Sequence, residues 1–152
     1  MSGYNESAYK QARDTAIALP CPFERALLSL CAGCSKSRKL LLAEREAITC
    51  TEQRANSQCL EFHDALHTNA RFALHIDPSQ AWPFGKEIRA QCGGILGLRE
   101  IMTTPEFDPG SDISHLVNVG LTHFGDIADF PYSEIMRAIV HYEPRKRRND
   151  PA

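Results

Sequence analysis

The sequence predicts an all-α, single-domain helical bundle of five to seven helices. Apolar residues recur at helical spacing along most of the chain. No segment shows the sustained alternation of apolar and polar residues that is typical of a half-buried strand, and 152 residues is a usual length for one domain. We expect this domain to cover residues 1–144 and a basic C-terminal tail to cover 145–152.

Two helical stretches are expected in the first third of the chain. Residues 7–19 predict a first helix, which Pro20 and Pro22 end because proline cannot continue a helix. Between residues 23 and 48 the apolar positions repeat about every 3.5 residues, which also indicates helix. Gly33 marks a possible break in this second stretch.

The central helix is expected to begin at a capping box. Thr49 and Glu52 form the pattern T-x-x-E that precedes many helices, and Asp77 with Pro78 would end the helix. Its expected apolar stripe consists of Ala55, Cys59, Phe62, Leu66, Ala70 and Ala73.

The second half of the chain is expected to hold further helices separated by glycine- and proline-rich segments. The expected order is a loop at 78–85, a short helix at 86–91, a break at Gly93 and Gly94, a helix from 95, a linker at 103–112, and helices at 113–124 and 132–142.

The distribution of charge argues against a nucleic-acid-binding domain. The net charge is −2, but residues 145–148 contribute four basic side chains, and residues 1–144 carry 13 basic and 18 acidic residues. A nucleic-acid-binding domain would instead present a basic face. We therefore expect a protein partner, with nucleic acid contacted only through the basic tail.

The N-terminus resembles no secretory signal, and no apolar run reaches the roughly 18 residues of a membrane span. We expect a cytoplasmic protein that does not contact membranes. In a reducing compartment, cysteines are more often metal-binding or catalytic than cross-linked, so disulfides are the least favoured explanation of the cysteines.

Six cysteines follow the spacing C-x9-C-x2-C-x15-C-x8-C-x32-C. The spacing matches neither the paired C-x2-C motifs of a zinc ribbon nor the compact run of a bacterial ferredoxin. We predict an iron–sulfur cluster, 4Fe–4S ahead of 2Fe–2S, with zinc as the second choice. The expected ligands are Cys34, Cys59, Cys92 and then Cys50, with Cys21 and Cys31 in reserve.

Local context supports several of these cysteines. Cys50 would be the first helical residue, where the helix dipole stabilises a thiolate. Cys21 precedes Pro22, as an iron–sulfur ligand does in one ferredoxin motif. The glycines after Cys92 would let backbone approach a cluster. A straight helix would hold Cys50 and Cys59 about 13 Å apart along its axis, so they share one centre only if that segment is not a straight helix.

Two other functions compete with the iron–sulfur prediction. The first is a metal-free interaction module whose cysteines are core residues and whose partner contacts the aromatic loop at 78–85 or the tail. The second is an enzyme that uses the Cys50 thiol or a zinc ion on His63 and His67. These histidines are spaced as in H-E-x-x-H, but Asp64 replaces the glutamate and no third ligand is evident. We favour a non-enzymatic role.

Overall fold

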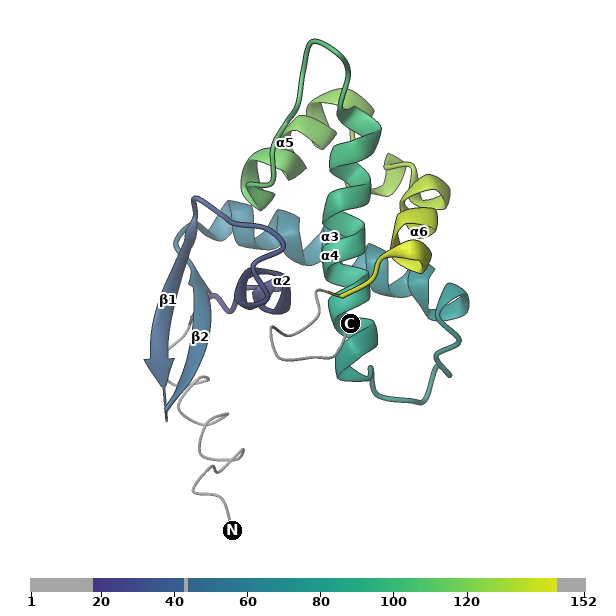
Figure 1. Cartoon of the computed structure of the whole chain (residues 1–152). Coiled ribbons are helices and arrows are strands. Elements are labelled where there is room, and N and C mark those ends of the chain that lie inside the picture. The colour runs from purple at the N-terminus through teal and green to yellow at the C-terminus, as the bar shows by residue number, and fades with distance from the viewer. Residues whose placement is uncertain (1–17, 43, 145–152) are drawn as a thin grey trace, which may run out of the picture.

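The computed structural model describes residues 18–42 and 44–144 (Figure 1). Residues 7–17 of the expected first helix and the tail at 145–152 lie outside the described residues. The described elements are α2 (Glu24–Leu28), β1 (Ser37–Leu42), β2 (Arg45–Cys50), α3 (Gln53–Ala73), α4 (Phe84–Met102), α5 (Ile113–Phe124), the 3₁₀ helix η1 (Ile127–Asp129) and α6 (Tyr132–His141).

The prediction of an all-α fold is wrong, because β1 and β2 form an antiparallel hairpin. Their register runs from Ser37 opposite Cys50 to Leu42 opposite Arg45, which leaves two residues for the turn. Glu44 in this turn has a φ of 66°, in the left-handed region. The 3.5-residue spacing between 23 and 48 is therefore not a helical stripe; only its first part, α2, is helical.

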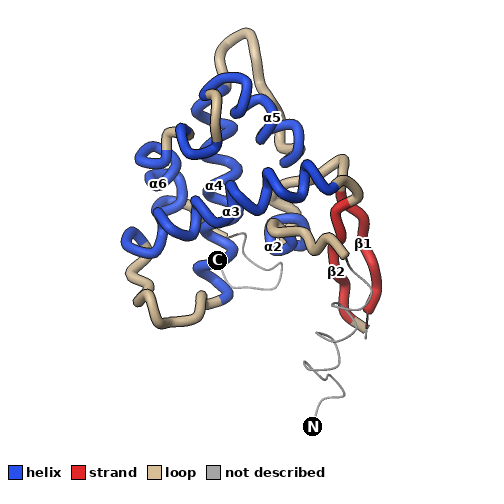
Figure 2. The backbone as a smooth tube through the Cα atoms, turned by 180° about the vertical axis from the view of Figure 1, so that it is seen from behind, coloured by secondary structure: helices blue, strands red, loops and turns tan. Residues whose placement is uncertain are grey.

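The hairpin is held to the helices through a buried carboxylate. An isolated two-stranded sheet is only marginally stable in water. Here the backbone amide of Ile48 donates a hydrogen bond of 2.9 Å to Glu24 Oε2, and the Ile48 side chain is buried. Figure 2 shows the two strands at one end of the helical assembly, beside α2.

The predicted capping box is also wrong. Thr49 lies in β2, and α3 begins at Gln53 after Glu52, whose side chain makes no capping hydrogen bond. Cys50 is consequently the last residue of a strand and not the first of a helix. The segment from Cys50 to Cys59 is not a straight helix, which removes the geometric objection to a shared centre.

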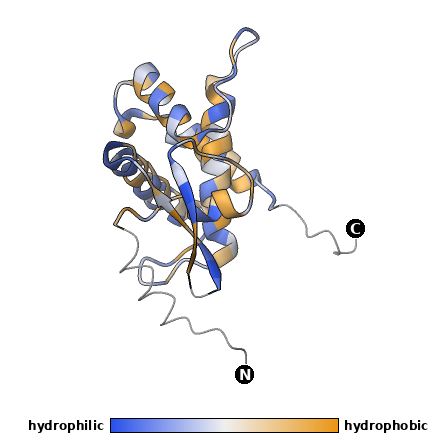
Figure 3. Cartoon of the chain, turned by 90° about the vertical axis from the view of Figure 1, so that its left-hand side faces the viewer, coloured by the Kyte–Doolittle hydropathy of each residue, from blue (hydrophilic) through white to orange (hydrophobic). Residues whose placement is uncertain are grey.

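The helices pack around α4, which α3 crosses, while α6 lies alongside it (Figure 1). The predicted apolar stripe of α3 is confirmed from Ala55 to Ala70, and Phe62, Leu66 and Ala70 are fully buried; Ala73, its last predicted member, is only partly buried. The helices expected at 113–124 and 132–142 are confirmed to within one residue. Viewed from the hairpin side, apolar residues gather in the central helices and polar residues along much of the hairpin (Figure 3).

The predicted break at Gly93 and Gly94 is wrong, because α4 is continuous there. Both glycines instead permit close helix packing. A Cβ atom on Gly93 would lie 2.7 Å from the Ile139 Cα in α6, and one on Gly94 would lie 2.6 Å from the Leu66 side chain in α3. A Cβ atom on Gly93 would displace the backbone of α6, and one on Gly94 would require the Leu66 side chain to move.

Replacing Gly93 with alanine is expected to lower the free energy of unfolding by about 1–3 kcal/mol, because the added methyl group meets the α6 backbone. Gly85→Ala, in the same helix, is the matched control. No atom lies within 4 Å of its added Cβ, so we expect no loss and a gain of up to about 1 kcal/mol from helix propensity. Urea denaturation measures both changes, and equal effects at the two positions would contradict this account of α4 packing.

Candidate metal centre

Four cysteines from separate parts of the chain line one small cavity. They are Cys21, Cys34, Cys50 and Cys59, and none of them is in a disulfide. The cavity is small: the volume open to the centre of a water molecule is about 20 Å³. Phe23 and Ile113 also line the cavity. Three of the four predicted ligands and one of the reserve pair thus meet at a single place.

Cys21 and Cys50 are brought together by backbone pairing. The amide of Cys21 donates to the Ile48 carbonyl oxygen at 3.1 Å, and the amide of Cys50 donates to the Leu19 carbonyl oxygen at 2.8 Å. Residues 19–21 therefore run antiparallel to the end of β2, with Pro20 opposite Thr49. This pairing fixes two of the cysteines on adjacent extended segments.

Cys34 and Cys59 reach the cavity from other directions. The Gly33 amide donates to the Ser111 carbonyl at 3.0 Å, and the Ile113 amide donates to the Gly33 carbonyl at 2.9 Å, which places Cys34 beside the start of α5. Cys59 lies on the buried face of α3, two turns into the helix, and is 8% exposed. The hairpin, α3 and α5 thus converge on the cavity.

Burial favours the neutral thiol form of the cavity cysteines when no metal is bound. The pKa of Cys21 and of Cys59 is raised to about 12, mainly by burial and in part by the neighbouring sulfurs. Burial also raises the pKa of Cys34. Without a metal these sulfurs are protonated thiols, so metal binding must displace their protons and depends on pH.

Backbone hydrogen bonds act in the opposite direction and stabilise the thiolate form. A bond from the backbone of Phe23 lowers the pKa of Cys21, and bonds from the backbones of Lys36 and Ser114 lower that of Cys34. Amide hydrogen bonds to cysteine sulfur are a common means of tuning metal–thiolate centres. Lys36 also lines the cavity and pairs with Glu52 at 3.1 Å.

The four sulfurs are more widely spread than the ligands of a single ion. Within the described residues, the one group of three or more potential ligand atoms that lie within 4.8 Å of one another is His63, His67 and Glu87. The cysteine sulfurs form no such group. Thiolates that share one zinc ion lie within about 4 Å of each other, whereas in a 4Fe–4S cluster each of the four thiolates binds a different iron atom.

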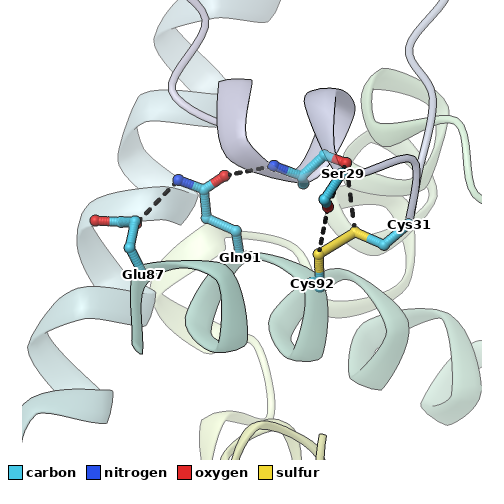
Figure 4. Close-up of a disulfide and its surroundings, with 6 residues drawn as sticks. Ser29, Cys31, Glu87, Gln91 and Cys92 are labelled. Atoms are coloured by element: carbon cyan, nitrogen blue, oxygen red, sulfur yellow. Dashed lines mark hydrogen bonds between the residues drawn. A yellow bond between two sulfur atoms is a disulfide. The ribbon is translucent and has the colours of Figure 1, made fainter. Parts of the chain in front are cut away.

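The remaining two cysteines, Cys31 and Cys92, are joined in a disulfide with a Cα–Cα distance of 6.0 Å. Figure 4 shows this bond between the segment after α2 and the middle of α4, with the Ser29 hydroxyl 3.4 Å from Cys92 Sγ. The expectation that disulfides were the least favoured explanation is therefore wrong for this pair. The structure places Cys92, a predicted ligand, apart from the four-cysteine cavity.

His63 and His67, the alternative candidates, meet a third residue that the sequence did not reveal. Glu87, in the first turn of α4, lies against both imidazoles. Burial raises the pKa of Glu87, but hydrogen bonds with His63, His67 and Gln91 outweigh burial and hold this pKa well below its usual range. For His63, burial lowers the pKa, and hydrogen bonds with Glu87 and Asp64 outweigh it, so the pKa is raised.

No described helix is both long enough and apolar enough to cross a membrane. Comparison with protein-family models, with characterised proteins and with solved structures finds no match to this chain. The functional argument therefore rests on the chemistry of the sites themselves.

Proposed function

We propose that this protein binds a 4Fe–4S cluster through the thiolates of Cys21, Cys34, Cys50 and Cys59. The observation that carries the proposal is the convergence of four unpaired cysteines, far apart in sequence, on one cavity. Four cysteine thiolates are the usual ligand set of such a cluster. The backbone hydrogen bonds to Cys21 and Cys34 support the proposal, because they offset the negative charge of a thiolate-bound cluster.

As they lie, the sulfurs are too far apart to share one zinc ion, and a 4Fe–4S cluster would require this cavity, which has room for about one water molecule, to widen. Thiolates around one tetrahedral zinc ion lie within about 4 Å of each other. No three of these four sulfurs lie within 4.8 Å of one another. The metal-free alternative treats the cysteines as core residues. It accounts less well for Cys21, Cys34 and Cys50, which are partly exposed around the cavity.

The proposed role of the cluster is electron exchange with a protein partner or redox sensing. Three of the four ligands are partly exposed, so a redox partner or an oxidant could approach the centre closely. The proposal includes a cytoplasmic location, because free thiols persist best in a reducing compartment. The disulfide of Cys31 with Cys92 is unusual for that compartment; Cys92 is fully buried, whereas Cys31 is partly exposed.

The test is the metal content of the full chain purified without oxygen. We expect iron and acid-labile sulfide in equal amounts, about four of each per chain, together with a visible charge-transfer band. Zinc without sulfide would replace the cluster with a single-ion site. Absence of both metals, also after reconstitution with iron and sulfide, would overturn the proposal.

A further inference from the structure

We propose that His63, His67 and Glu87 form a second metal site, which binds one zinc ion through two imidazoles and a carboxylate. The histidines are one turn apart on α3, and Glu87 comes from the start of α4. This site does not include any cysteine and does not depend on the proposed iron–sulfur cluster.

The spacing of the three ligand atoms suits a zinc ion. Glu87 Oε2 lies 2.8 Å from His67 Nε2 and 3.4 Å from His63 Nε2, and one ligand atom from each residue lies within 4.8 Å of the other two. Ligand atoms around a tetrahedral zinc ion with bonds of about 2.0–2.1 Å are roughly 3.3 Å apart. Small side-chain adjustments would therefore bring all three atoms into coordination.

Residues hydrogen-bonded to the three ligands orient them, as in known zinc sites. In those sites a ligating histidine donates a hydrogen bond from its other ring nitrogen to a carboxylate, and a ligating carboxylate is itself hydrogen-bonded. Asp64 Oδ1 lies 3.2 Å from His63 Nδ1, which leaves Nε2 of that ring for the metal. Gln91 Nε2 donates to Glu87 Oε2 at 2.9 Å, and Gln91 Oε1 accepts the Ala26 amide at 2.9 Å. Figure 4 shows Gln91 bridging Glu87 and the backbone of α2.

The surroundings shelter the three ligands without closing the site. Their side chains are 17–20% exposed, so an ion can enter. The Trp82 ring stacks on the His67 imidazole with centroids 3.9 Å apart, which limits rotation of that ligand.

The donor set favours a first-row transition metal over magnesium or calcium. Two imidazoles and one carboxylate bind zinc more tightly than manganese or iron(II), although the same donor set also holds iron(II) in non-haem iron sites. Magnesium and calcium prefer sites built from oxygen alone. Three protein ligands leave a fourth position for water, as in catalytic zinc sites and unlike the closed four-ligand structural sites.

Zinc titration of the full-length protein tests the site. Trp82 is the only tryptophan in the chain, so its fluorescence reports on metal binding beside it. Elemental analysis after dialysis gives the amount bound, and X-ray absorption at the zinc edge distinguishes nitrogen and oxygen ligands from sulfur. We expect one zinc ion per chain with nitrogen and oxygen ligands.

Glu87→Gln and His67→Ala are the test variants, and His115→Ala, which removes an exposed histidine of α5, is the control. Loss of a direct ligand should weaken zinc binding by about 100-fold or more, since even outer-contact changes cost roughly 10–100-fold, while the control should bind as the unmodified chain does. Glu87→Gln keeps the size of the side chain, so it remains informative if His67→Ala misfolds. Zinc held only by sulfur, no zinc bound, or unchanged affinity in Glu87→Gln would each overturn the proposal.

Discussion

Replacing Cys59 with alanine is expected to abolish binding of the proposed iron–sulfur cluster. The side chain is 8% exposed and lines the cavity from α3, and alanine supplies no ligand atom in its place. Removal of a direct ligand should weaken cluster binding by about 100-fold or more, beyond the roughly 10–100-fold effect of outer contacts. Iron and sulfide analysis of protein purified without oxygen measures the loss.

Cys21→Ala, Cys34→Ala and Cys50→Ala are expected to show the same loss, because all four cysteines line one cavity. The variant in which both Cys31 and Cys92 are replaced with alanine is the matched control. It removes two cysteines that are joined to each other outside the cavity, so it should keep its iron when it is assayed well below its lowered melting temperature. If the control loses its iron while Cys21→Ala retains it, the four cysteines of the cavity are not the ligands of the cluster.

The helices that could be predicted are those whose packing follows their own sequence. The α3 stripe that includes Phe62 and Leu66 repeats at helical spacing, so its buried face could be read directly from the sequence. The hairpin could not be predicted, because β1 has no alternation. Leu41, between two other leucines, is 74% exposed. Its strand character comes from pairing with β2 and from the buried Glu24 bond to the Ile48 amide.

The candidate site was predictable in its residue types but not in its grouping. Cysteine content alone pointed to all six residues, whereas the choice among them depends on long-range pairing. Cys21 reaches the cavity because residues 19–21 pair with β2, and Cys92 does not because it faces Cys31 across 61 residues of sequence. Glu87 had no sequence signal either, since its position opposite His67 arises only when α3 and α4 pack together.

Removing the disulfide, by replacing Cys31 and Cys92 with alanine, is expected to lower the free energy of unfolding by about 4 kcal/mol. The bond closes a loop with a sequence separation of 61, and the chain-entropy model gives roughly this value for such a loop. The loss is a large fraction of the 5–15 kcal/mol that is typical of a folded domain. For a chain of this size it corresponds to a melting temperature lower by roughly 10 °C.

A comparison with and without reductant separates the bond from packing, because Cys92 is fully buried and its truncation also leaves a small void. The unmodified chain should lose stability when its unfolding is measured in reductant, and the double variant should not respond to reductant. The metal-free, denatured chain should also react with a thiol reagent at four cysteines before reduction and at all six afterwards. Six reactive thiols before reduction would mean that Cys31 and Cys92 are not joined. The stability difference between the two chains would then reflect packing alone. The proposed cytoplasmic location would also no longer conflict with a disulfide.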